Sequence, residues 1–134
     1  MNAFGIKNDG KTVYYIKKTA NILLVNVSLI QNDNAYDKLV DRENRVIRLL
    51  SPPFSEEDAS KFGYIAAYPK GIRENGGQYT HAAVWATMAF AMLEDKEKAW
   101  ELFKMLLPIN HSKTKSEACL YKTEPYVMCA DIYT

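Results

Sequence analysis

The sequence lacks the features that assign a chain to a membrane, a nucleic-acid complex or the secretory route. No apolar run approaches the roughly 20 residues needed to cross a bilayer, and the start of the chain does not resemble a signal peptide. The 17 basic and 16 acidic residues give a net charge of +1 without a basic stripe. Nucleic acid is therefore not expected as a partner, and a cytoplasmic protein without membrane insertion is predicted.

Cysteine is scarce as well. Cys119 and Cys129 are the only two, and without an export signal we expect free thiols rather than a disulfide. These cysteines do not combine with His81, His111 or Glu124 at the tight spacing of metal ligands, so no metal site is predicted. The sequence also has no phosphate-binding loop, dinucleotide fingerprint or nucleophile elbow, and no bound cofactor is expected.

The chain is rich in aromatic side chains that have a polar edge, with nine Tyr and two Trp. Such rings suit contacts with sugars and with other proteins, but they also fill ordinary cores. The length of 134 residues fits one domain with a core of moderate size.

Residues 1–31 are expected to form a separate N-terminal segment with a small β-hairpin. Phe4–Lys7 and Thr12–Ile16 alternate around an Asn8-Asp9-Gly10 turn, which is typical of two antiparallel strands. The following run, Ile22–Ile30, fits either a third strand or a buried helix, because periodicity does not separate the two at this length.

Residues 32–134 are predicted to be mainly helical. A short helix is expected within 32–44, and then an extended run over 46–50. Residues 54–77 read mostly as an ordered loop, because they contain prolines, glycines and aromatic rings without clear periodicity. Gln78–Leu93 is the clearest helix, and since nearly every face of it is apolar it is expected to be buried all round.

A second helix follows after a very short connection and forms an αα-hairpin with the first. Asp95 is expected to cap a helix over Lys96–Leu107, and Pro108 should end it. Further helical turns are predicted at Ser116–Leu120 and Pro125–Ile132.

The segment Gly71–His81 places polar side chains at the start of the apolar helix. The guanidinium of Arg73 suits a phosphate or carboxylate, and the carboxylate of Glu74 suits sugar hydroxyls. His81 falls in the first helical turn, where the helix dipole favours an anion. The competing interpretation is a well-capped helix start with a local ion pair and a structural histidine.

Most of the chain, from about residue 35 to residue 133, resembles a known family. The matching motifs occur in the family's order: Leu49–Phe54, Gly63–Ile65, Tyr68–Ala83, Ala99–Phe103, Pro108–His111, Tyr121–Lys122, Glu124–Val127 and Ala130–Tyr133. Together they resemble the inverting glycoside phosphorylases related to cellobiose phosphorylase, in particular the C-terminal phosphorylase-like part of cyclic β-1,2-glucan synthase. The Arg-Glu-Asn-Gly-Gly-Gln-Tyr-Thr-His string from Arg73 to His81 is the most specific of these matches.

The resemblance implies a partial α/α-toroid of helical hairpins over residues 32–134. It also implies cleavage of β-glucosidic bonds with inorganic phosphate as co-substrate and inversion at the anomeric carbon. Such a reaction needs one carboxylic acid to protonate the leaving oxygen, while phosphate is the nucleophile. By resemblance, the residues that bind substrate and phosphate are Arg73, Glu74, Asn75, Gln78, Tyr79, His81, Glu124 and Tyr126.

Two family motifs are missing from the sequence. One is the Asp-Trp-Asn-Asp-like motif that carries the general acid, and the other is a Gly-, Thr- and Trp-rich loop that helps to bind phosphate. The chain is thus expected to be a fragment of a phosphorylase-like domain, without a catalytic residue and inactive alone. The alternative is a non-catalytic module that binds carbohydrate, phosphate or protein. Since covering hairpins are not encoded, the apolar helix predicts a homo-oligomer.

Overall fold

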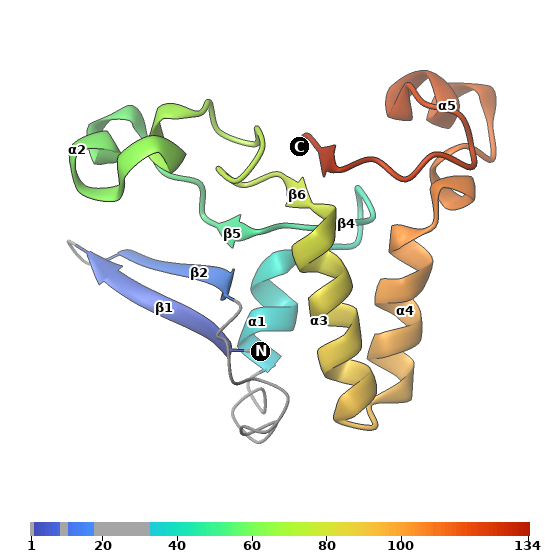
Figure 1. Ribbon diagram of the computed structural model, residues 1–134, viewed down its shortest axis with the longest axis horizontal. Helices are drawn as coiled ribbons and strands as arrows, with labels where there is room; N and C mark the ends of the chain where they lie inside the picture. The colour runs from blue at the N-terminus through green and yellow to red at the C-terminus, as the bar shows by residue number, and fades with distance from the viewer. Residues whose placement is uncertain (1, 9–10, 18–32) are drawn as a thin grey trace.

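The computed structural model describes residues 2–8, 11–17 and 33–134, and the described part is mainly helical with a few short antiparallel strands (Figure 1). At its centre α3 (Thr80–Met92) and α4 (Lys96–Leu106) run antiparallel as a hairpin. Helix α1 (Asp33–Leu39) packs against this hairpin, and its Tyr36 contacts both Phe90 of α3 and Glu101 of α4. The predicted αα-hairpin is confirmed.

Local signals set the turn between α3 and α4. The Asp95 carboxylate accepts a hydrogen bond from the Lys98 backbone N–H at 3.1 Å, as expected of an N-cap. Glu94 adopts a left-handed conformation with φ of 61°, which reverses the chain within a few residues. After Leu106 the chain passes into a 3₁₀ helix, η4 (Pro108–His111), so the helix ends just before the proline, as predicted.

The main core lies between α1, the hairpin and two short strands, β3 (Val40–Asp41) and β4 (Val46–Ile47). The Tyr36 ring packs edge-on against Phe90 with 5.4 Å between centroids, and its hydroxyl donates to the Glu101 carboxylate. The core combines aromatic, aliphatic and methionine side chains: Tyr36, Ile47, Ala83, Phe90, Leu102, Met105 and Leu106.

The N-terminal hairpin is confirmed as β1 (Asn2–Asn8) and β2 (Lys11–Lys17), which pair antiparallel. Strand β5 (Leu50–Ser51) extends this sheet along β2. The predicted turn at residues 9–10 and the ambiguous run at residues 22–30 lie outside the described residues.

Residues 54–77 contain more regular structure than the predicted loop. They include η2 (Glu56–Asp58), α2 (Ala59–Phe62) and η3 (Gly63–Ala67). The prediction missed these turns because each is too short to show a helical period. Aromatic packing orders them, since the Phe54 and Phe62 rings stack at 4.3 Å over a small second core.

The C-terminal part holds one confirmed helix and one correction. Helix α5 (Lys115–Tyr121) is capped by Thr114 and covers the helical turn predicted near residue 116. The helical turn predicted over Pro125–Ile132 is wrong, because the chain there forms β7 (Asp131–Ile132). This strand pairs with β6 (Gln78–Tyr79). Because residues 78 and 79 are in this strand, α3 begins at Thr80 rather than at Gln78 as predicted.

Helix α3 is not buried on all sides, contrary to the expectation from its composition. Met88 and Met92 are 54% and 48% exposed, and Trp100 and Phe103 on α4 are exposed as well. No helix in the described part of the chain is both long enough and apolar enough to cross a membrane.

Candidate functional site

The predicted site centres on the chain that leads into α3, residues 71–79, which we call the entrance segment. Its path depends on glycine. A Cβ atom on Gly77 would lie 2.8 Å from the Arg73 carbonyl oxygen and 2.9 Å from that of Ile132. Gly76 has a φ of 98°, a backbone conformation that residues other than glycine rarely adopt. The Gly-Gly pair thus lets the backbone pass close to two other parts of the protein.

Asn75 anchors the middle of the entrance segment and is completely buried. Its Oδ1 accepts a hydrogen bond from the Phe54 N–H at 2.7 Å. Its Nδ2 donates to the carbonyl of Phe54 at 3.2 Å and to that of Tyr68 at 2.7 Å. The side-chain amide therefore takes the place of a strand partner for a neighbouring loop.

Gln78 anchors the end of the entrance segment in the same way and is only 1% exposed. Its Oε1 accepts from the Ile47 N–H of β4 at 2.8 Å, and its Nε2 donates to Thr80 Oγ1 at 3.1 Å. The polar atoms of Gln78 and Asn75 are thus hydrogen-bonded inside the protein, where they fix the backbone of the entrance segment.

Side chains before and after these anchors, together with one from β7, form a strip of polar and aromatic groups. The Arg73 guanidinium lies over the Tyr68 ring at 5.6 Å, and its Nε is 4.0 Å from Asp131 Oδ2. Asp131 is in turn the strand partner of Tyr79. The rings continue onto α3, with 6.1 Å from Tyr79 to His81 and 4.3 Å from His81 to Trp85. We call this the polar–aromatic strip: Tyr68, Arg73, Tyr79, His81, Trp85 and Asp131.

Glu74 differs from its neighbours because one of its oxygens is left without a partner. Its Oε2 is buried, yet it has no hydrogen-bond partner among the described residues. An unpaired buried acceptor costs free energy, typically about 1–3 kcal/mol and more for a charged group. A hydroxyl or water donor would satisfy it, which is the chemistry of a sugar-binding carboxylate.

Glu124 and Tyr126 lie apart from the strip in this structure. Both are exposed on the connection between α5 and β7, and Tyr126 is 81% exposed. In the described part of the chain, no hydrogen bond, ion pair or ring contact joins either side chain to the strip. The structure thus brings together the residues of the Arg73–His81 string and leaves these two at a distance.

Three members of the strip were not among the predicted site residues. Trp85 had a usable signal, since it follows His81 by one helical turn. Tyr68 lies just before the entrance segment and stacks on Arg73. Asp131 had no local signal, because it reaches the strip only through the pairing of β7 with β6.

The chain belongs to the glycosyl hydrolase 94 superfamily, because residues 26–134 match its catalytic domain. More particularly, it is 51% identical over 106 residues to cyclic beta-(1,2)-glucan synthase NdvB of Rhizobium meliloti (strain 1021). The match covers 79% of this chain but 4% of the relative, so the chain spans a small part of that protein's length. The family resemblance stated from the motifs is confirmed.

Proposed function

We propose that the polar–aromatic strip is one wall of a site for a glucose-type sugar or β-glucan and inorganic phosphate. The observation that carries this proposal is the division of the Arg73–His81 string into two sets. Asn75 and Gln78 are buried and anchored, whereas Arg73, Tyr79 and His81 are exposed side by side. Buried anchors that fix exposed polar groups are the usual construction of a pre-formed ligand site.

Each group in this wall has a chemical role in the proposal. Arg73 contributes a guanidinium for phosphate, and His81 lies in the first turn of α3, where the helix dipole attracts an anion. Beside the strip, the unpaired Glu74 Oε2 accepts a hydrogen bond from a sugar hydroxyl. Tyr79 and Trp85 offer ring surfaces to a sugar. Glu124 and Tyr126 remain predicted contacts that face the same site.

Binding is tested by calorimetric titration of the purified chain with β-1,2-glucan oligosaccharides, glucose 1-phosphate and phosphate. Arg73→Gln and His81→Ala should each weaken phosphate binding, whereas Lys70→Gln, an exposed residue outside the strip, should not. No heat with any of the three ligands contradicts the proposal. It would favour the second candidate, a module that interacts with another protein.

We also propose that the chain does not catalyse phosphorolysis on its own. Inversion needs a general acid at the leaving oxygen. The Asp-Trp-Asn-Asp-like motif that carries it in the family does not occur in this sequence. Incubation with a β-1,2-glucan and phosphate should therefore release no glucose 1-phosphate. Release above a boiled-protein control would show that another carboxyl group acts as the acid.

We also propose that the α3–α4 hairpin is a unit of a partial α/α-toroid and that a second copy of the chain covers its open side. Exposed apolar side chains support this, namely Met88, Met92, Trp100 and Phe103. Light scattering should give a dimer mass that Trp100→Glu shifts to the monomer, whereas Lys70→Glu, at an exposed position outside the hairpin, should leave it unchanged. A monomer mass for the unmodified chain at micromolar concentration contradicts self-association.

A further inference from the structure

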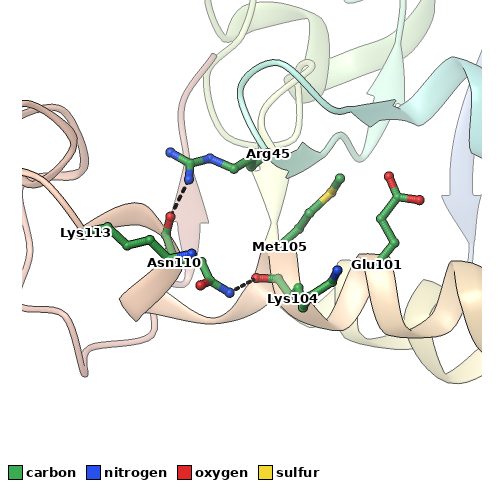
Figure 2. A pocket seen from close by; sticks show the side chains of 6 residues that line it. All are labelled: Arg45, Glu101, Lys104, Met105, Asn110 and Lys113. Carbon is green, nitrogen blue, oxygen red and sulfur yellow. Dashed lines mark hydrogen bonds between the residues drawn. The ribbon is translucent and has the colours of Figure 1, made fainter.

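A pocket lies where α4 meets η4 and the turn between β3 and β4 (Figure 2). It encloses about 230 Å³ and is lined by Arg45, Glu101, Lys104, Met105, Asn110 and Lys113. None of these residues belongs to the polar–aromatic strip. We call this site the cation pocket.

A network of hydrogen bonds fixes the walls of the cation pocket. Arg45 Nη1 donates to the Asn110 carbonyl at 2.6 Å, and its Nη2 pairs with Glu117 at 2.6 Å. The Asn110 amide in turn donates to the Lys104 carbonyl at 2.8 Å. Arg45 itself has a φ of 58°, an unusual conformation for a residue with a side chain. The pocket is thus built by contacts between three separate segments.

The lining of the cation pocket carries more positive than negative charge. Arg45, Lys104 and Lys113 face a single carboxylate, Glu101. That carboxylate already accepts hydrogen bonds from Tyr36 and from Arg42, the latter at 2.8 Å.

Lys104 and Lys113 form no ion pair within the described residues. Figure 2 shows the Lys113 side chain extending toward Asn110 from the side of the pocket opposite Glu101. Lys104 Nζ lies 6.0 Å from the centre of the Trp100 ring. In the described part of the chain neither ammonium group is held in an ion pair with a carboxylate, so both can pair with an added anion, while Arg45 and Glu101 are occupied by their own partners.

We propose that the cation pocket binds the phosphate group of a small anion, with Lys104 and Lys113 as the charged contacts and the Asn110 amide beside them. Phosphate suits this lining because it accepts several hydrogen bonds and carries up to two negative charges at neutral pH. The volume is below the roughly 300–1,000 Å³ of sites for drug-sized ligands. The bound phosphate group would therefore belong either to inorganic phosphate or to a sugar monophosphate. The inference is independent of the proposed function, because it uses no residue of the strip.

The test uses the full chain with methionine methyl groups labelled with ¹³C. Met105 lines the pocket, whereas Met88 and Met92 are exposed on α3 and serve as internal controls. The Met105 signal is identified as the one that disappears in the Met105→Leu variant. Inorganic phosphate and glucose 6-phosphate are titrated separately at constant ionic strength, with chloride as the blank. The Met105 signal should shift and saturate with both, while the control signals stay in place.

The double variant Lys104→Gln/Lys113→Gln should weaken the apparent affinity, by roughly two- to fivefold for each exposed lysine. Lys115→Gln, on the nearby helix α5 but outside the lining, is the matched control and should change nothing. Arg73→Gln removes a phosphate contact of the strip and should leave the Met105 titration intact. This variant separates failure of the present inference from failure of the proposed function.

Equal affinity for the two anions would assign the ligand as phosphate itself, and tighter binding of glucose 6-phosphate would place a sugar in the remaining volume. Both results support the pocket. A Met105 signal that does not move, that moves equally with chloride or glucose, or that moves equally in the double variant would overturn it.

Discussion

The α3–α4 hairpin and the entrance segment adjoin each other in the chain but are stabilised in different ways. In the hairpin, an N-cap on Asp95 and buried apolar side chains such as Leu102 act together. In the entrance segment, the fixed points are two amides, Asn75 and Gln78, and a glycine, Gly77. The hydrogen-bond partners of the two side-chain amides lie outside the entrance segment, whereas Gly77 lies close to Ile132 and also to Arg73 and Gly71 of the segment itself.

The difference has a consequence for function. The helical backbone hydrogen bonds of α3 lie within the helix itself, and packing in the core stabilises it. The wall that carries Arg73 and Tyr79 instead takes shape only when other parts of the chain are in place. These parts are the backbone at Phe54, strand β4 and strand β7. Substitutions in the entrance segment should thus affect folding and ligand binding together. Substitutions in the hairpin away from His81 and Trp85, such as at the Asp95 cap, should affect folding and leave binding by the strip unchanged.

The largest effect is expected for Gly77→Ala. The added Cβ would approach three carbonyl oxygens, those of Arg73, Ile132 and Gly71, at 2.8 to 3.0 Å. Backbone atoms cannot move away as a flexible side chain can, so the free energy of unfolding should fall by about 3 kcal/mol. Urea unfolding followed by tryptophan fluorescence measures the loss.

Gly63→Ala is the matched control for this substitution. Gly63 also has a positive φ, of 65°, but a Cβ there would meet no atom within 4 Å. Only the conformational cost remains, roughly 1–3 kcal/mol for a side chain at φ of 65° and ψ of −147°. If the two variants lost the same stability, the close passage of the backbone at Gly77 would not be the constraint that shapes the entrance segment.

Asn75→Ala should produce the next largest loss, about 2–3 kcal/mol. The substitution leaves the buried Phe54 N–H and the Tyr68 carbonyl without their partners, and unpaired buried groups are costly. Affinity for the ligand that the strip binds should fall as well, because Arg73 loses its fixed support.

Asn44→Ala provides the comparison. The Asn44 amide donates to Asp41 on the surface, so this substitution should lower the free energy of unfolding by well under 1 kcal/mol. Thermal unfolding and calorimetric titration of both variants check the pair. An Asn75 variant with reduced stability but unchanged affinity would separate folding from binding and contradict the coupling proposed for the entrance segment.

The same contrast explains how much could be predicted from the sequence. The helix at Lys96, its cap and its end before Pro108 follow from residues within a few positions of each other, and the structure confirms them. Tyr79 and Asp131 instead meet as partners in strands β6 and β7, which are far apart in the sequence. A two-residue strand shows no periodicity, so the segment before residue 132 was wrongly expected to be helical and Asp131 was missed.

Within the Arg73–His81 string, the sequence predicted a set of site residues but did not indicate which of them are buried and which are exposed. Asn75 and Gln78 are as polar as Arg73 and His81, and the sequence does not say which of them are buried. Burial is decided by the backbone groups of Phe54 and Ile47, which need side-chain partners because no neighbouring strand supplies them.

Asp95→Ala should cost about 1 kcal/mol, the usual value for an N-cap, because the Lys98 N–H loses its acceptor. The hydrogen bonds from the Lys98 backbone and side chain also lower the pKa of Asp95. Ligand affinity should remain that of the unmodified protein, since the cap lies at the far end of α3 from the strip. A parallel loss of affinity would show that the hairpin and the entrance segment are coupled after all.

The smallest effect is expected for Glu101→Gln, and it concerns pH. Burial alone would raise the pKa of Glu101, but hydrogen bonds from Tyr36 and Arg42 outweigh it, and the pKa lies below the ordinary value of 4.5. The unfolded chain therefore binds a proton more readily than the folded one. The stabilisation by Glu101 is complete above the unfolded pKa and is lost as the pH falls through the folded pKa.

At neutral pH the glutamine variant should be at most about 1 kcal/mol less stable, because the pair is partly exposed and screened by solvent. The difference between the two proteins should shrink as the pH is lowered below 4.5, which urea titrations at several pH values would measure. The anchors of the entrance segment are neutral amides, so the stability lost in the Asn75 variant should not change over the same range. A constant difference for Glu101→Gln would mean that packing rather than charge joins α4 to α1, and the contrast between the two regions would then rest on the glycines and amides alone.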